Sequence, residues 1–118
     1  MKVVQCYLVR REKFNDVKSK LIQENVEFIE EEGNYHVLII PLSEIKLENI
    51  GKKYLLMDEK DILELDIPGQ SFKIESTRDI IEKFAGAFIS KGKKVNLENP
   101  ESTIEIKKWK DKYLVSVS

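Results

Sequence analysis

The chain has 118 residues, of which 42% are hydrophobic and 35% are charged, and its formal net charge at pH 7 is −1. This length fits one ordinary domain or two small halves, and no apolar run approaches the roughly 20 residues that span a membrane. A single cysteine excludes an internal disulfide, and the early charges argue against a secretion signal, so we expect a cytoplasmic protein.

The first part of the chain alternates between strand and helix patterns. β-branched and alternating apolar residues predict strands at 3–10, 26–31 and 35–42, with a turn at Gly33. Residues 12–25 carry apolar side chains at helical spacing and predict an amphipathic helix, whose inner face holds Phe14, Val17, Leu21 and Ile22. Strand, helix, strand, strand is the order of a ferredoxin-like unit, which we assign to residues 1–42.

The middle of the chain, residues 43–70, gives the weakest pattern. Ser43 and Glu44 predict the start of a short helix that carries Ile45, Leu47 and Ile50. Asp58 predicts the cap of a second helix that carries Ile62, Leu63 and Leu65, and Pro68-Gly69 ends it. We place the boundary between the two halves between residues 41 and 69.

The last part repeats the order strand, helix, strand, strand. SFKIEST at 71–77 alternates and predicts a strand, and residues 78–92 predict a helix that ends at Gly92. Its apolar face is formed by Ile80, Ile81, Phe84, Ala85, Phe88 and Ile89. The small residues at 85–87 predict a close approach of this helix to the sheet. Residues 103–118 predict two strands joined near Lys110-Asp111, so the predicted fold class is α+β or α/β, with two βαββ units packed together.

The charges are unevenly distributed along the sequence. Residues 1–70 hold 10 basic and 14 acidic side chains, whereas residues 71–118 hold 10 basic and 7 acidic ones. Lysines cluster in SKGKK and KKWKDK, and such clusters are typical of phosphate-binding surfaces. Highly charged small domains also use lysines for solubility alone, so the charge pattern by itself leaves both interpretations open.

The C-terminal part resembles a THUMP domain, the RNA-binding module of tRNA-modifying enzymes. The resemblance covers roughly residues 60–118 and rests on SFKIEST, the helix with FAGAFI, the loop KVNLENPESTIEI and the final VSVS. Its most specific element is VNLENPE followed by an alternating strand. Only Ser76, Thr77 and Arg78 separate SFKIE from the helix, where the family has a longer basic loop, so part of the expected RNA surface is shortened.

The resemblance implies that residues 43–118 bind tRNA, largely through its acceptor end. On this basis and on the lysine clusters, the candidate RNA-binding residues are Lys73, Arg78, Lys91, Lys93, Lys94, Lys107, Lys108, Trp109 and Lys110. Within this loop, Asn96, Asn99 and Pro100 fit ordinary turn chemistry better than direct contact with RNA. For Trp109 two interpretations are equally open, namely stacking on an unpaired base or packing at the edge of the core.

The sequence shows no catalytic motif. THUMP enzymes carry their chemistry in a separate domain, and neither a glycine-rich phosphate loop, an Asn-Pro-Pro-aromatic motif nor a set of zinc ligands is present here. We interpret His36 as a strand residue, Cys6 as a core residue and Glu30–Glu32 as a solvated edge. We therefore expect no enzyme activity, cofactor or metal.

Three hypotheses for the function remain. The leading one is a non-catalytic adaptor that presents tRNA to a separate modifying enzyme, like the small THUMP partner of tRNA cytidine acetylation. The second is the N-terminal RNA-binding part of a tRNA methyltransferase or 4-thiouridine synthase. The third is a ferredoxin-like domain that binds a small molecule or a protein and has no role with RNA.

Overall fold

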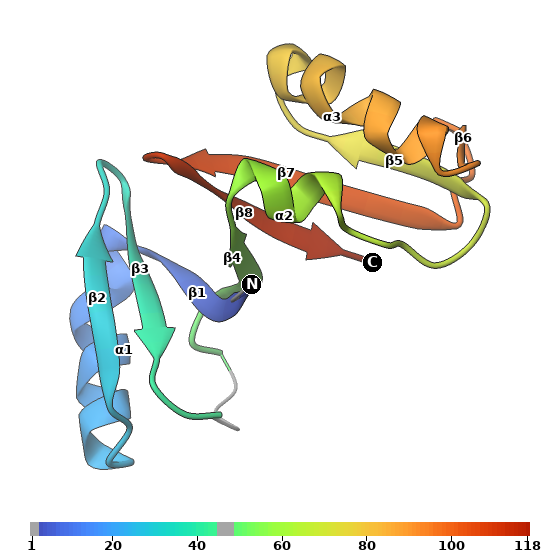
Figure 1. The fold of residues 1–118 in the computed structure, drawn as a ribbon. Helices are drawn as coiled ribbons and strands as arrows, with labels where there is room; N and C mark the ends of the chain where they lie inside the picture. The colour runs from blue at the N-terminus through green and yellow to red at the C-terminus, as the bar shows by residue number, and fades with distance from the viewer. Residues whose placement is uncertain (1–2, 45–48) are drawn as a thin grey trace. The chain divides into compact units, whose positions relative to one another are not determined.

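The computed structural model describes residues 3–44 and 49–118 and divides them into two compact units, Val4–Tyr54, and Leu55–Ser118 together with Val3. We call them the N-terminal unit and the C-terminal unit and describe each by itself. Both combine strands with helices, which confirms the α+β class (Figure 1). The predicted order of strand, helix and two strands is confirmed in the N-terminal unit. In the C-terminal unit three strands follow the predicted helix, because the unpredicted two-residue strand Lys94–Val95 comes before the predicted pair.

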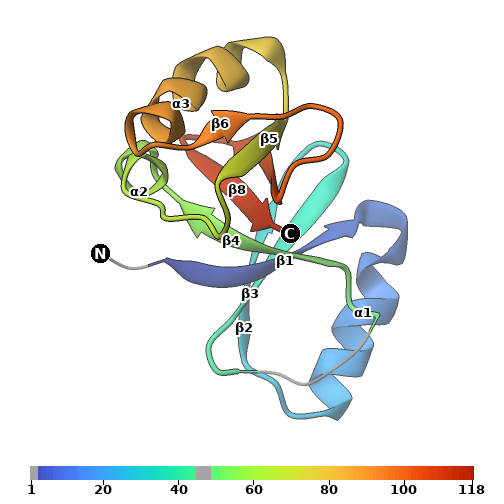
Figure 2. The same cartoon turned by 90° about the vertical axis from the view of Figure 1, so that its right-hand side faces the viewer.

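The N-terminal unit contains one helix and an antiparallel sheet in the order β2-β3-β1. Its elements are β1 (Val4–Arg10), α1 (Arg11–Gln23), β2 (Phe28–Glu32) and β3 (His36–Pro41). The helix lies along one side of β2 and β3 (Figure 2) and buries Val17 and Leu21 against Tyr7, Val9 and Ile39. This is the predicted ferredoxin-like order, although Ile22 is 59% exposed and lies outside this core.

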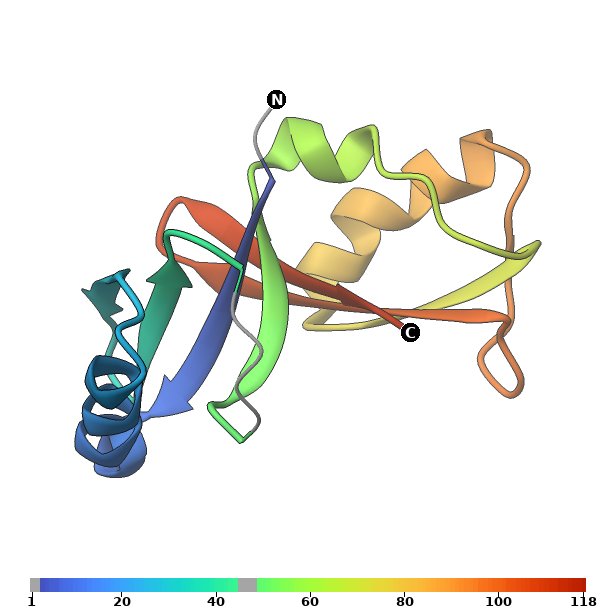
Figure 3. The same cartoon turned by 90° about the horizontal axis from the view of Figure 1, so that it is seen from below.

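The C-terminal unit contains two helices and a mixed sheet in the order β4-β8-β7-β5-β6. Its elements are β4 (Lys52–Met57), whose first residues belong to the N-terminal unit, α2 (Glu59–Leu63), β5 (Ser71–Glu75), α3 (Arg78–Ser90), β6 (Lys94–Val95), β7 (Ser102–Trp109) and β8 (Lys112–Val117). α3 crosses one face of β5, β7 and β8 (Figure 3). The β7–β8 hairpin turns at Lys110-Asp111 as predicted, and Lys110 adopts a φ of 53° there.

The core of the C-terminal unit lies between the sheet and α3. Phe84 and Phe88 of α3 are fully buried. The ring of Phe84 packs edge to face against that of Tyr113, with 5.2 Å between the ring centres, and the ring centres of Phe88 and Phe72 are 5.3 Å apart. Each buried aromatic ring contributes roughly 1.5–3 kcal/mol by leaving water. Because the same alternation buries Ile74, Ile104 and Ile106, one face of the sheet is apolar and packed while the other faces away from α3.

Several sequence predictions need correction. Strand β4 was not predicted, because Lys52 and Lys53 are exposed and only Tyr54 and Met57 are buried in it. Ile89 is 52% exposed rather than part of the inner face of α3. Gly86 is exposed, and a Cβ there would meet no atom within 4 Å, so it does not serve a close approach to the sheet. The helix predicted at Ile45 and Leu47 falls on residues 45–48, outside the described residues.

Candidate nucleic-acid interface

Strand alternation sorts the candidate RNA-binding residues of β7 onto two faces. Ile104 and Ile106 point toward α3, so Lys107 and Trp109 point to the opposite face. Lys108 lies on the α3 side, where its Nζ sits 4.3 Å from the centre of the Tyr113 ring. The lysines of KKWKDK therefore do not form one continuous patch.

Residues of the neighbouring strands join Lys107 and Trp109 on the face away from α3. Lys94 pairs with Ser71, which alternates with the buried Phe72, and Lys112 pairs with Trp109. Lys73 alternates with Phe72 and Ile74 and shares this face. We call this set the basic face; its members are Lys73, Lys94, Lys107, Trp109 and Lys112. Lys73 and Lys107 are about 13 Å apart along the strands, because Lys73 pairs with Thr103, four residues before Lys107.

The members of the basic face differ in their local contacts. Lys73 forms an ion pair with Glu75 at 3.7 Å, and Glu105 lies beside Glu75 on the same face. Within the described ranges, Lys94 and Lys107 are exposed and form no ion pair. These two lysines have the greatest freedom to contact a phosphate group.

Two lysines of SKGKK serve the structure of the C-terminal unit. Lys91 donates hydrogen bonds of 2.8 Å to the carbonyl oxygens of both Leu63 and Leu65, at the end of α2. Lys93 is half-buried and donates to the carbonyl oxygen of Gly69. A lysine that satisfies the last carbonyls of a helix stabilises that helix end. Whether Lys91 and Lys93 also contact RNA stays a prediction.

The loop KVNLENPE is held by its own turn chemistry. The Asn96 Oδ1 accepts hydrogen bonds from the backbone N–H groups of Glu98 and Asn99, at 3.2 and 3.0 Å, which confirms the interpretation of Asn96 as a turn residue. The Glu101 carboxylate accepts from the N–H of Gln70, and the Ser102 hydroxyl donates to the carbonyl of Pro68. The loop is thus fixed to the segment that precedes β5.

The remaining candidate residues lie at α3 and at the β7–β8 turn. Arg78 begins α3 and forms an exposed ion pair with Glu82 at 3.1 Å. Lys110 lies in the turn, with its Nζ 5.9 Å from the Trp109 ring. Such exposed pairs contribute little to stability, so neither residue is rigidly held by them.

A cavity of about 540 Å³ opens where β5 ends and α3 begins. The partly exposed Ile80 of α3 supplies its apolar wall, and Thr77, Lys107 and Lys108 line its polar parts; Ile106 of β7 also borders it but is only 1% exposed. The sequence pattern did not predict this cavity, because it arises from β7 continuing beyond the end of β5.

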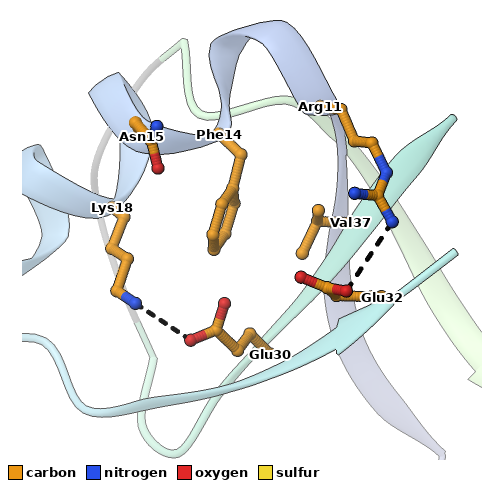
Figure 4. Close-up of a pocket in the computed structure, with 7 residues that line it drawn as sticks. All are labelled: Arg11, Phe14, Asn15, Lys18, Glu30, Glu32 and Val37. Atoms are coloured by element: carbon orange, nitrogen blue, oxygen red, sulfur yellow. Dashed lines mark hydrogen bonds and ion pairs between the residues drawn. The ribbon is translucent and has the colours of Figure 1, made fainter.

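A second, more polar groove of about 590 Å³ lies in the N-terminal unit (Figure 4). Phe14 stands in it between two ion pairs, Lys18 with Glu30 at 3.0 Å and Arg11 with Glu32 at 3.6 Å. The Arg11 guanidinium also donates to the carbonyl oxygens of residues 33 and 34. The two ion pairs thus join α1 to β2. Glu30 and Glu32, two of the three glutamates of the predicted acidic edge, belong to them.

The described residues offer little for nucleophilic or metal chemistry. Cys6 is fully buried in β1, its Sγ donates to the carbonyl of Tyr54 at 3.5 Å, and burial raises the pKa of its thiol to about 12. Cys6 is therefore the core residue that was predicted. In residues 3–44 and 49–118, no three His, Cys, Asp or Glu side chains are grouped to hold a metal ion, and no helix is long and apolar enough to cross a membrane.

Solved structures of other proteins share this fold. The crystal structure of PH1313 from Pyrococcus horikoshii aligns over 100% of this chain and 54% of its own, with a TM-score of 0.66 and 13% identity. TrmN from Thermus thermophilus aligns over 98% of this chain and 45% of its own, with a TM-score of 0.64 and 12% identity. A 4-thiouridine synthetase solved with RNA and ATP aligns over 98% of this chain and 41% of its own, with a TM-score of 0.55 and 12% identity.

These structures contain THUMP domains, so the chain has a THUMP-like fold, as the sequence resemblance implied. The chain spans about half the length of the solved structures that it matches. No protein-family model and no curated protein sequence matches it.

Proposed function

We propose that this chain binds tRNA through the basic face and acts as a non-catalytic adaptor for a separate tRNA-modifying enzyme in the cytoplasm. The basic face carries the proposal, because Lys94 and Lys107 are exposed cations on the same side of the sheet as Trp109. Exposed lysines attract phosphates without reading sequence, and an aromatic ring among them offers a stacking surface for a base.

The fold supports the same proposal. One of the matching structures was solved as a complex with RNA, and it shares the fold over 98% of this chain. We propose that the bound region of tRNA is the acceptor end with its CCA sequence. The separate enzyme would supply the chemistry, because the buried Cys6 thiol and the mutually paired charges of the N-terminal groove offer no activated group.

The salt dependence of tRNA binding tests the RNA-binding part of this proposal. Changing both Lys94 and Lys107 to Gln should weaken binding to different tRNAs to a similar extent. The slope of log affinity against log salt concentration should become less steep by about 1.4–1.8, because two phosphate contacts are lost. Lys13 and Lys60 are exposed lysines outside the basic face, and the matched control changes both of them to Gln. If both double variants lose affinity equally, net charge rather than the basic face governs binding.

The adaptor part has its own experiment. The pure protein, incubated with tRNA and S-adenosylmethionine, acetyl-CoA or ATP, should leave every nucleoside unmodified, as measured by mass spectrometry of the digested RNA. A modified nucleoside would contradict a non-catalytic role. Comparing tRNA with and without its CCA end tests the proposed acceptor-end contact.

A second candidate is that the chain is the RNA-binding part of a larger tRNA methyltransferase or thiouridine synthase. The observation that favours it is coverage, since the chain matches only 41–54% of the three solved structures. Sequencing the messenger RNA on both sides of the coding segment distinguishes the two: an in-frame catalytic domain supports the second candidate, and flanking stop codons support the adaptor.

A further inference from the structure

The cavity at the end of β5 lies along an open stretch of strand β7. β5 ends at Glu75, which pairs with Glu105, whereas β7 continues to Trp109. In the part of the chain that the structure describes, β8 alone accompanies β7 beyond this point. The cavity is lined by this stretch of β7 and by the turn that leads into α3.

The register of the hairpin determines which backbone groups face the cavity. Thr103 and Ser118 exchange hydrogen bonds of 2.7 and 2.9 Å, so alternate residues from Thr103 to Trp109 direct their N–H and C=O groups to β8. Lys108 therefore directs its backbone groups to the other edge, which lines the cavity. On that edge the carbonyl of Ile106 already accepts a hydrogen bond of 2.6 Å from Ser76.

This edge is too short for an added peptide strand. A peptide that extends a sheet needs a ladder of free backbone groups, and between the end of β5 and the turn only Lys108 presents both of its groups to this edge. A planar base, in contrast, needs one donor and one acceptor at its edge and apolar contacts at its faces. Ile80, which is partly exposed and lines the cavity, supplies such an apolar contact.

The charges around the cavity also favour an arrangement in which the base lies inside the cavity and its phosphate group lies outside it. Glu75 and Glu105 line the cavity beside Lys107 and Lys108. The carboxylates repel a phosphate group inside but accept hydrogen bonds from exocyclic amino groups of bases. Lys107 is exposed and belongs to the basic face, where it can hold the phosphate that follows the base.

We propose that this cavity binds one unpaired nucleobase of an RNA strand. The base packs against Ile80 and forms hydrogen bonds with the backbone of Lys108, and Lys107 contacts the adjacent phosphate. This inference rests on the proposed RNA-binding function and adds to it the part of the protein that selects single-stranded over paired nucleotides.

The test uses three RNAs with the same duplex: one blunt, one with a three-nucleotide single-stranded 3′ extension, and one whose extension carries abasic residues. The wild-type protein should bind the extended RNA about tenfold more tightly than the other two, as expected for one inserted base. The abasic extension keeps its phosphates, so it separates recognition of the base from attraction to charge.

Variants of Thr77 locate the effect. Thr77 is exposed at the cavity and, among the described residues, its hydroxyl makes no cap hydrogen bond to α3, so its replacement removes no such bond. Thr77→Trp should fill the cavity and lose the tenfold preference while its affinity for the blunt duplex stays unchanged. Thr77→Ala is the matched control and should keep the preference.

The outcomes separate this inference from the proposed function. If the wild-type protein binds all three RNAs equally, the base-binding cavity is wrong and general RNA binding stands. If it binds none of them and no tRNA, the proposed function fails as well. If a folded Thr77→Trp protein keeps the preference, the base binds elsewhere. The Lys108 amide should also exchange its hydrogen more slowly with the extended RNA, and unchanged exchange would contradict the backbone contact.

Discussion

The ammonium group of Lys93 donates a hydrogen bond to the carbonyl oxygen of Gly69, a residue 24 positions earlier in the chain. Lys91 makes the same kind of contact with the carbonyls of Leu63 and Leu65. Both lysines thereby hold the segment between α2 and β5 against the end of α3. Of the three lysines in SKGKK, Lys94 is thus the one whose exposed side chain belongs to the basic face.

Changing Lys93 to Met should lower the free energy of unfolding by about 1–3 kcal/mol, because the half-buried Gly69 contact loses its charged donor while the aliphatic stem is retained. Lys94→Met is the control and should change it by no more than about 0.5 kcal/mol. Urea unfolding followed by circular dichroism measures both. Equal effects of the two changes would contradict a structural role specific to Lys93.

Changing Gly69 to Ala should destabilise the C-terminal unit by more than about 1 kcal/mol. Gly69 has a φ of +79°, and an added Cβ would lie 2.6 Å from the Cβ of Glu101. Gly86→Ala is the opposite case, because Gly86 lies within α3 and its added Cβ would meet nothing within 4 Å. It should stabilise the protein by roughly 0.5–1 kcal/mol. Thermal melting of both variants would show shifts of opposite sign.

The sequence predicted the elements whose apolar residues repeat without interruption. Phe72 and Ile74 in β5, and Ile104 and Ile106 in β7, alternate and are buried as expected. Strand β4 was missed because a single pair of buried residues, Tyr54 and Met57, gives no alternation. Element type therefore followed from local pattern, while weakly patterned strands depend on partners far away in the chain.

The candidate site was less predictable than the fold. The sequence places Lys91, Lys93 and Lys94 within four residues, yet the acceptors that engage Lys91 and Lys93 lie 24–28 residues away. Composition identifies such lysines as a cluster but carries no information about these carbonyl oxygens. The cavity beside Ile80 was likewise invisible, because it depends on where β5 ends relative to β7.

The cap of α2 should make the protein sensitive to acid at Asp58. Asp58 and Asp61 form a capping box, and the Asp61 N–H, which donates to Asp58 at 2.9 Å, is the main reason why the pKa of Asp58 lies below its ordinary value. A carboxylate whose pKa is lower in the folded state stabilises that state above the unfolded pKa of about 3.9, and this stabilisation disappears as the pH falls through the folded pKa.

Asp58→Asn keeps the acceptor oxygen but removes the titration, so it isolates this effect. The wild-type protein should melt at a higher temperature than Asp58→Asn at pH 6, and the difference should shrink as the pH falls from about 5 to about 2. Melting curves at three pH values measure it. A difference that stays constant over this range would show that the Asp58 charge does not stabilise the cap.

Cys6 should react with thiol reagents only when the N-terminal unit opens. Its side chain is fully buried, and burial raises the pKa of its thiol to about 12, so almost no thiolate exists at pH 8. Labelling with a maleimide at pH 8 should therefore be slow in buffer and rapid in 6 M urea, as followed by mass spectrometry. Rapid labelling of the folded protein would mean that β1 separates readily from its neighbours.

Trp109 distinguishes the RNA-binding interpretation from a packing one. It is half-buried and lies on the face away from the core under α3, opposite Lys112 and beside Lys110, whose Nζ is 5.9 Å from its ring. Phe84, by comparison, is fully buried in that core. The two aromatic residues thus provide a matched pair within one unit.

Changing Trp109 to Ala should cost about 1–3 kcal/mol of RNA-binding free energy, the loss of one base stacked on an aromatic ring. Its effect on the free energy of unfolding should be smaller than that of Phe84→Ala, for which about 3–5 kcal/mol is expected from the cavity left in the core. Urea unfolding and tRNA titration of both variants separate the two quantities, with affinity expressed per folded molecule. If Trp109→Ala destabilises the fold as much as Phe84→Ala and the folded fraction binds tRNA normally, the ring packs at the sheet edge and does not stack on RNA.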